Sequence, residues 1–193
     1  MSSAHSDHEA SLTGQLLIAM PSLTERSFAH TVIFLCAHSL KDGAMGLIIN
    51  RRLTEPGFDD LLAQLDISPT PPRRRIALCS GGPMESSRGF VLHSSDWTGD
   101  GSLTVDDGVV LTASLDVLRE IADGHGPKQA LLALGHAAWG PGQLESEIRQ
   151  NAWLSVQAND ALVFGGDHDR KWHLALATLG VDPSRLAAEA GNA

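Results

Sequence analysis

The segment "LHSSDW" carries the side chains that come nearest to a nucleophilic site. A histidine, two serines and an aspartate fall within positions 93–96, and these groups together form the triad of many hydrolases. Triad members converge from distant segments, however, and neighbours on a strand point to opposite faces of a sheet. We therefore interpret the segment as a strand that ends in a turn, with Asp96 and the serines bonded to the backbone. His93 and Ser94 stay candidates for ligand binding.

The segment "SGGPMESSR" is the second candidate. Adjacent glycines adopt backbone conformations in which consecutive N–H groups can hold an anion, but they also form tight turns between strands, which is the reading we favour. Ser80 comes near to a nucleophile elbow, although Leu78 stands where that motif requires its first glycine. The candidate binding residues of this segment are Gly81, Gly82, Pro83, Glu85 and Arg88.

The third candidate is "GHAAWGPGQLESEIRQNAWL", residues 135–154. We expect a buried strand to end at Gly135, a tight aromatic loop to follow, and a helix to begin where its free N–H groups can meet a ligand. Alternatively, Trp139 fills the core and Gly-Pro-Gly only sets a sharp turn. The candidate binding residues here are His136, Trp139, Gly140, Gln143 and Glu145.

Motifs that indicate a cofactor or a metal are missing from the sequence. It contains no GxxxxGK[ST], GxGxxG, HExxH, CxxC or EF-hand loop. In "GDHDRKWH", His168 and His173 are five positions apart, which fits no metal spacing, and Asp167 or Asp169 is expected to cap a helix instead. The sequence therefore predicts neither a metal nor a cofactor.

The charge balance limits the partners. Fourteen Lys and Arg against 23 Asp and Glu give a formal net charge of −9, which opposes binding to nucleic acid, because that affinity comes largely from basic residues. Phosphate contact would have to start at the basic run Arg73, Arg74 and Arg75, which we read instead as a solvated loop edge. No apolar run approaches the roughly 20 residues of a membrane span, so no membrane partner is expected.

The N-terminal segment 1–11 is polar and lacks the basic and apolar regions of an export signal. We expect a disordered tail there, followed by a single domain at 12–193 in the cytoplasm. Cys36 and Cys79 each lie in an apolar run, as buried free thiols do in a reducing compartment.

The elements that must position these residues follow from periodicity. Apolar runs rich in β-branched residues predict strands, with Asp42-Gly43 turning a hairpin. The strands are expected at 14–20, 31–39, 45–50, 76–79, 89–94, a short pair within 102–111, and 128–136. Stripes at helical spacing predict helices at 58–65, 112–123, 142–151 and 172–179. Thr112 or Ser114 is expected to cap the second helix, and Glu145 to pair with Arg149 in the third.

Strands in runs, single helices between them and an antiparallel hairpin predict an α+β fold with a mixed, mainly antiparallel sheet. Several blocks together also resemble the AlgH/YqgE family of bacterial proteins over residues 12–180. Besides 135–154, these blocks are "GQLLIAMPSL", "GLIINRRL", "SGGPMESSRGFVLHSSDW" and "LTASLDVLREIADGHGP". The resemblance implies a bifurcated sheet that curls into a pseudo-barrel with flanking helices. It implies no established enzymatic activity, although some members are labelled transcriptional regulators.

Two positions depart from the family pattern "GYAGWGPGQLE", since this chain has His136 and Ala138 there. If the tyrosine hydroxyl of that pattern serves a ligand, His136 must supply a different donor, one that titrates nearer neutral pH. The chain contains no tyrosine.

Dense motifs without a catalytic signature predict a noncatalytic cytosolic binding or regulatory protein. Its binding surface would combine 80–88, 93–96 and 136–145, and its partner would be a small molecule or a protein. One alternative is a transcriptional regulator that acts on or near DNA. The other is an unrecognised hydrolase that uses His93, Ser94 or Glu145.

Overall fold

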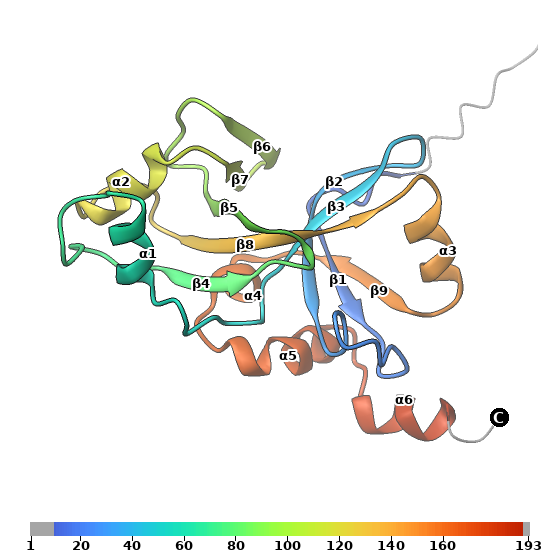
Figure 1. Cartoon of the computed structure of the whole chain (residues 1–193). Helices are drawn as coiled ribbons and strands as arrows, with labels where there is room; N and C mark the ends of the chain where they lie inside the picture. Colours follow the sequence, from blue (N-terminus) through green and yellow to red (C-terminus); the bar gives the residue numbers. More distant parts are fainter. Residues whose placement is uncertain (1–9, 191–193) are drawn as a thin grey trace, which may run out of the picture.

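The computed structural model describes residues 10–190, and within them nine strands form one sheet (Figure 1). The strand order is β6-β7-β5-β8-β3-β2-β1-β9, and β4 pairs with β8 outside this path. β4 runs parallel to β8, whereas the other pairs are antiparallel. The strands are β1 Gln15–Ala19, β2 Val32–Ser39, β3 Gly43–Ile48, β4 Ala77–Ser80, β5 Met84–Ser94, β6 Ser102–Asp106, β7 Val109–Thr112, β8 Ala130–Trp139 and β9 Trp153–Gln157. The predicted α+β class with a mainly antiparallel sheet is confirmed.

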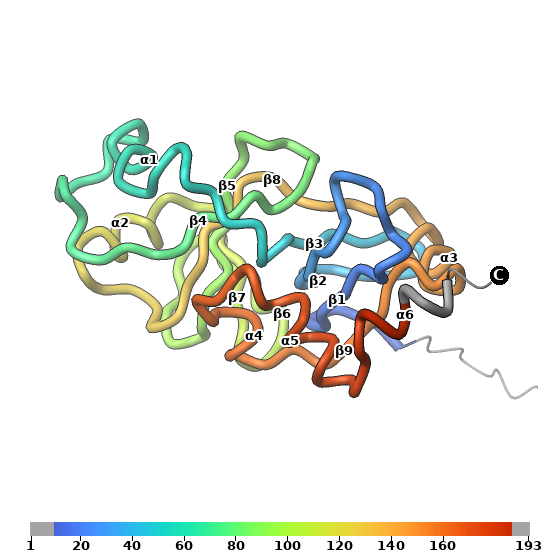
Figure 2. The backbone as a smooth tube through the Cα atoms, turned by 90° about the horizontal axis from the view of Figure 1, so that it is seen from below, coloured from blue at the N-terminus to red at the C-terminus, as the bar shows by residue number. Residues whose placement is uncertain are grey.

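The helices lie around this sheet. They are α1 Phe58–Gln64, α2 Asp116–Ala122, α3 Gln143–Arg149, α4 Asp160–Phe164, α5 Lys171–Thr178 and α6 Pro183–Ala190, with a 3-10 turn, η1, at His168–Arg170. Figures 1 and 2 show α1 and α2 together at one end of the molecule and α3 at the opposite end. No helix within residues 10–190 has the length and hydropathy that a membrane crossing requires. Residues 1–9 of the predicted polar tail lie outside the described residues.

β8 joins the two halves of the sheet. Residues 130–134 pair with β4 and β5, and residues 137–139 pair with β3. Between them Gly135 has a φ of +79°, and a Cβ at this position would lie 2.5 Å from the carbonyl oxygen of Gly82. A side chain is therefore excluded there, and β8 passes close over the β4–β5 turn. The sheet curls into a half-barrel around this strand, in agreement with the family resemblance.

The prediction of an aromatic loop after Gly135 is wrong, because β8 continues to Trp139. Ala137 pairs with Gly46 of β3, so the chain remains a β-strand beyond Gly135 because it pairs with β3. Ala137 and Trp139 are buried while Ala138 is exposed, which is the period of two that a strand requires. Because Ala137 and Ala138 are the same residue type, the sequence does not show which of the two is buried, and the strand periodicity is not visible there.

Other element predictions are wrong at their boundaries. β5 begins at Met84, inside the predicted glycine-rich loop, and the edge strand β9 has no counterpart among the predicted strands. The cap predicted for α2 is absent, because Thr112 belongs to β7 and Leu115 precedes the helix without a side-chain hydrogen bond. Asp167 likewise precedes η1 without a capping bond. For β5 and β9, pairing with β8 and β1 overrides the local propensity.

Apolar cores cover both faces of the sheet. One lies against α4 and α5 and includes Phe34 and Trp172. A second lies between α1, α2 and the strands β4, β5 and β8, and it includes Leu62 and Leu132. A third surrounds Trp139 beside α3. The second core leaves a space beside the middle of β5, and Arg88 is the candidate residue in its lining.

Candidate functional site

The turn between β4 and β5 is built for close approach to β8. A Cβ on Gly81 would lie 2.2 Å from the carbonyl oxygen of Gly135, and a Cβ on Gly82 would lie 2.2 Å from the carbonyl carbon of His136. The Gly81 N–H donates to a β8 carbonyl at 2.7 Å. Both glycines thus serve strand packing, in agreement with the reading as an interstrand turn, and Pro83 is exposed.

Just after this turn, a β-bulge between Met84 and Gly89 gathers side chains from β5 and β8. We call this set the bulge cluster; it consists of Glu85, Arg88, Phe90 and His136. The Arg88 guanidinium lies 3.2 Å from the Glu85 carboxylate and 4.9 Å from the centre of the Phe90 ring. The Phe90 and His136 rings meet edge to face, with centroids 5.9 Å apart. Three candidate residues from two distant segments therefore share one surface.

Two features of the bulge cluster are energetically unfavourable. Glu85 has a φ of +44°, and a non-glycine residue in the left-handed region costs roughly 1–3 kcal/mol. Nδ1 of His136 is buried without a hydrogen-bond partner among the described residues, since the nearest carboxylate oxygen, from Glu85, is 3.8 Å away. Backbone strain and an unpaired buried polar atom at the same place are typical of functional sites.

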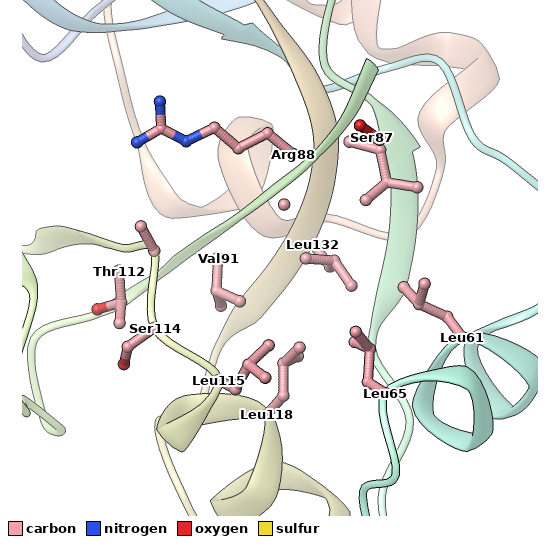
Figure 3. Close-up of a pocket in the computed structure, with 13 residues that line it drawn as sticks. Leu61, Leu65, Ser87, Arg88, Val91, Thr112, Ser114, Leu115, Leu118 and Leu132 are labelled. Carbon is pink, nitrogen blue, oxygen red and sulfur yellow. The ribbon is translucent and has the colours of Figure 1, made fainter. Parts of the chain in front are cut away.

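The α1–α2 pocket lies beside the bulge, with a cavity of about 210 Å³ between the two helices and the sheet (Figure 3). Its apolar walls come from Val91 and six leucines, which are Leu61, Leu65, Leu115, Leu118, Leu132 and Leu134. Arg88 is the one charged residue that the described part of the chain contributes to its lining. Figure 3 shows the apolar side chains around a common space, whereas the Arg88 side chain extends from the strand away from them. Its guanidinium lies over the Phe90 ring instead.

His93 is part of a closed hydrogen-bond chain and not of an open site. Its Nδ1–H donates to the carbonyl of Ser94 at 2.9 Å, so Nε2 accepts from the Thr112 hydroxyl at 2.7 Å. Thr112 in turn accepts from Ser102 at 2.8 Å, and Ser102 accepts from the Gly99 N–H at 3.1 Å. Burial lowers the pKa of His93, against the opposing effects of the Ser94 hydrogen bond and the Asp96 charge. A neutral imidazole with both nitrogens paired has no capacity left for a substrate proton.

Ser94 ties the end of β5 to the start of β8. Its hydroxyl donates to Asp96 and accepts from the Gln129 N–H at 3.0 Å, while the second Asp96 oxygen accepts from the Lys128 N–H at 3.0 Å. These bonds agree with the interpretation of "LHSSDW" as a strand that ends in a turn.

Trp139 belongs to a buried aromatic cluster. It stacks on Phe28 and meets Trp153 edge to face, and it is 5% exposed. Both indole N–H groups donate to the same oxygen of Glu147, at 2.7 Å and 3.2 Å. The tryptophan therefore fills the core. Glu147 was outside the predicted set, although its position three residues after Leu144 places it beside the apolar stripe of the helix.

The remaining candidates of this segment shape the turn before α3. The Gln143 side chain accepts from the Gly140 N–H at 3.0 Å, which closes the turn. Glu145 bonds to His38 of β2 with Nε2 and Oε1 2.5 Å apart, so its predicted partnership with Arg149 is wrong. The Leu12 N–H donates to Nδ1 of His38 at 3.0 Å, and the imidazole proton therefore resides on Nε2.

A second cavity of about 350 Å³ opens beside the His38–Glu145 pair, between α3 and Ser155 of β9. Burial acts to raise the pKa of Glu145, but the hydrogen bonds from His38 and from its own N–H outweigh burial, and the pKa lies below its usual value. The carboxylate is thus an anion held by a neutral histidine. His38 gave no signal in the sequence, because 107 positions separate the two residues.

The three residues of the hydrolase hypothesis are not brought together. His93 and Ser94 lie on β5, whereas Glu145 lies on α3 and faces β2. Within residues 10–190, no cluster of three or more His, Cys, Asp or Glu offers a metal site. Among the candidate residues of the described chain, Arg88 contributes to the lining of the α1–α2 pocket and Glu145 to that of the second cavity.

The basic run is engaged with the protein itself. Arg74 donates to three carbonyls of the 125–128 loop. Arg75 makes a bidentate pair with Asp59, with both bonds at 2.7 Å, and Arg73 lies 3.7 Å from the carboxylate that ends α2. Before these arginines could bind phosphate, they would have to give up these hydrogen bonds and ion pairs.

A buried lysine lies between α4, α5 and the end of β3. Nζ of Lys171 donates to the carbonyls of Ile49 and Val163 at 3.3 Å and 2.9 Å, and burial lowers its pKa to about 8. His168 bonds to the same Ile49 carbonyl at 3.2 Å, and Cys79 contacts it through sulfur at 3.8 Å. Both cysteines of the chain are buried free thiols, as predicted. These groups join α5 to the end of β3.

Comparison with known proteins supports the fold and the resemblance. Residues 16–184 match the AlgH-like protein family. The chain belongs to this family. A UPF0301 protein of Gluconobacter oxydans is 61% identical over 186 residues, which cover 96% of this chain and 100% of that protein. A UPF0301 protein of Rhodospirillum rubrum is 50% identical, with 96% of each chain covered.

Two solved structures share the AlgH-like fold. The solution structure of AlgH from Pseudomonas aeruginosa is 40% identical, with a TM-score of 0.75 and coverage of 100% of this chain and 99% of that one. A crystal structure from Corynebacterium diphtheriae has a TM-score of 0.70 at 24% identity, covering 88% and 87% of the two chains, and it supports the fold alone. None of these names specifies a reaction, so membership of the AlgH-like family establishes the architecture and not a chemistry.

Proposed function

We propose that this chain is a noncatalytic, cytoplasmic binding protein whose ligand is a small apolar molecule in the α1–α2 pocket. The observation that supports this proposal is a cavity of about 210 Å³ walled by leucines and Val91. Protein interiors are otherwise packed with few voids larger than a water molecule. An apolar cavity of about 150 Å³ is already large enough to bind benzene.

A noncatalytic role is supported by how the reactive side chains are used. Both imidazole nitrogens of His93 and of His38 are hydrogen-bonded within the chain. The Ser94 hydroxyl bonds to Asp96 and Gln129, so it has no imidazole base in contact. Nucleophilic catalysis requires a nucleophile and a base within hydrogen-bond reach, and these candidates do not meet that requirement.

The test is a titration of isotope-labelled protein with 1-octanol, followed by amide NMR. We expect shift changes at residues 87–89 and 113–118, which line or flank the pocket. Leu115→Trp should fill the cavity and abolish these changes. Leu174→Trp is the matched control, because Leu174 on α5 is 41% exposed and Leu115 is 37% exposed. A wild-type protein with no changes up to the solubility of the alcohol would show that the proposal is wrong.

A further inference from the structure

The second cavity is lined by two opposite charges that are not paired with each other. Glu145 and Arg149 stand four positions apart on α3, so their side chains lie on the same face of the helix, with Cβ atoms about 5–6 Å apart. The Glu145 carboxylate is bonded to His38 instead, and no ion pair in the described part of the chain includes Arg149. The cavity thus offers an anion and a cation within reach of one small molecule.

Side chains from β9 and from the segment before β1 complete the same space. Trp153 is buried in the core beside α3, whereas Leu154 packs on the opposite core. Because strand residues alternate between faces, Ser155 lies on the α3 side with Trp153, and it lines the cavity. Leu12 and Ile148 add apolar walls, and both also pack against the core beside α3. The charges and the apolar walls therefore face one space of about 350 Å³, a size that is usual for small-molecule sites.

We propose that the second cavity binds a free α-amino acid, with its ammonium group on Glu145 and its carboxylate on Arg149. Its side chain is apolar and lies against Leu12 and Ile148. The two charged groups of such a ligand are attached to one carbon atom, which suits partners that are one helical turn apart. A molecule with a single charge leaves one of these partners unpaired, and sites built to pair a polar group strongly reject analogues that lack it. The site goes beyond the proposed function, because the two cavities share no lining residue.

Both charged side chains have capacity left for a ligand. A carboxylate can accept about four hydrogen bonds, and the Glu145 carboxylate accepts from His38 and from its own N–H. The Glu145 side chain is 11% exposed, so an ammonium group interacts with it more strongly than in bulk water. Arg149 is exposed in the last turn of α3, and a guanidinium matches a carboxylate with two parallel hydrogen bonds. Burial raises the pKa of Glu145, whereas the His38 bond and the Arg149 charge lower it, so Arg149 lies within electrostatic reach of the carboxylate.

The experiment compares L-leucine with 3-methylbutylamine and 4-methylpentanoate, which share its carbon chain and lack the carboxylate and the ammonium group respectively. Binding is followed at pH 7 by amide NMR, and we expect leucine to shift the signals of residues 145–149 and to bind about tenfold more tightly than either analogue. Arg149→Gln should lower the affinity for leucine to that for the amine and leave amine binding unchanged. Arg119→Gln is the matched control, because Arg119 lies in the last turn of α2 and outside the cavity, and it should retain the preference for leucine.

A second variant tests the ammonium site. Glu145→Gln should lower the affinity for leucine to that for 4-methylpentanoate, in protein whose amide spectrum shows that it is folded. If this variant does not fold, Arg149→Gln decides the question, because Arg149 is exposed. Leucine that binds no more tightly than the analogues, an unchanged preference in Arg149→Gln, or no binding of leucine up to its solubility would overturn the inference. The titration with 1-octanol reports on the α1–α2 pocket separately, so failure at one cavity is distinguishable from failure at the other.

Discussion

Nε2 of His38 lies 2.5 Å from Oε1 of Glu145, and the two side chains are only 6% and 11% exposed. This contact joins the β2–β3 hairpin to α3 across 107 positions of sequence. Because the Leu12 N–H occupies the other imidazole nitrogen, the histidine is fixed in one tautomer and acts as a donor to the carboxylate. We therefore assign the pair to the stability of this end of the molecule and not to proton transfer.

Glu145→Gln should weaken this junction. A hydrogen bond to a charged group contributes about 1.5–3 kcal/mol, so we expect a loss of that size in the free energy of urea unfolding at pH 7. The pKa of Glu145 is lowered in the folded state, so its contribution is present above its ordinary value near 4.5 and is lost as pH falls through the folded pKa. The variant should consequently lose less stability in acid than the wild type. Glu120→Gln, at an exposed position of α2, should leave the acid profile unchanged.

Lys171→Met should change the alkaline profile. The pKa of Lys171 is lowered by burial to about 8 from its ordinary 10.5, so the unfolded chain binds more protons between these values, and stability rises with pH there. This difference in pKa corresponds to about 3 kcal/mol in the free energy of unfolding. Relative to the variant, the wild type should gain this amount between pH 7 and 10.5, measured by chemical denaturation. Parallel curves for the two proteins would contradict the assignment, and Lys41→Met, at an exposed position, provides the reference.

Two residues of the predicted binding surface should respond differently to alanine. Trp139 is 5% exposed and anchored to Glu147, so Trp139→Ala should cost about 3–5 kcal/mol. Arg88 is exposed and holds only a surface pair, so Arg88→Ala should change stability by about 0.5 kcal/mol or less. Urea unfolding of both variants measures this contrast. A fully stable Trp139→Ala protein would instead favour a role for the indole in binding.

The basic run should act on folding through its central residue. Arg74 donates to three backbone carbonyls, and Arg74→Met should cost about 1–3 kcal/mol because those acceptors lose a charged donor. Arg73 is 68% exposed, and Arg73→Met should cost about 0.5 kcal/mol or less. Salt-dependent binding to duplex DNA that disappears when Arg73 and Arg75 are neutralised would identify a phosphate site instead.

Local patterns were sufficient for much of the architecture. Apolar runs located β1 and β2, the Asp42-Gly43 signal located their hairpin neighbour β3, and the stripe from Phe58 located α1. These features depend on turn chemistry and on which face of one element is apolar, and both are properties of a few consecutive residues. The α+β class follows from the order of such elements.

The roles of the candidate residues depended on contacts between distant segments. From the sequence, Trp139 was equally consistent with a ligand-binding residue and with a core residue. The packing of Phe28 and Trp153 around it shows that it is a core residue. The bend of β8 at Gly135 likewise sets which side chains face the 84–89 bulge.

The sequence by itself thus determined the class of fold, the main hairpin and the residues with chemical potential. Only the tertiary structure decided that Glu85, Arg88 and His136 come together at the β5 bulge, and that an apolar cavity forms between α1, α2 and the sheet. The physical reason is that a cavity and an unpaired nitrogen are properties of how separate elements pack. Neither has a signature in the residues of any one element.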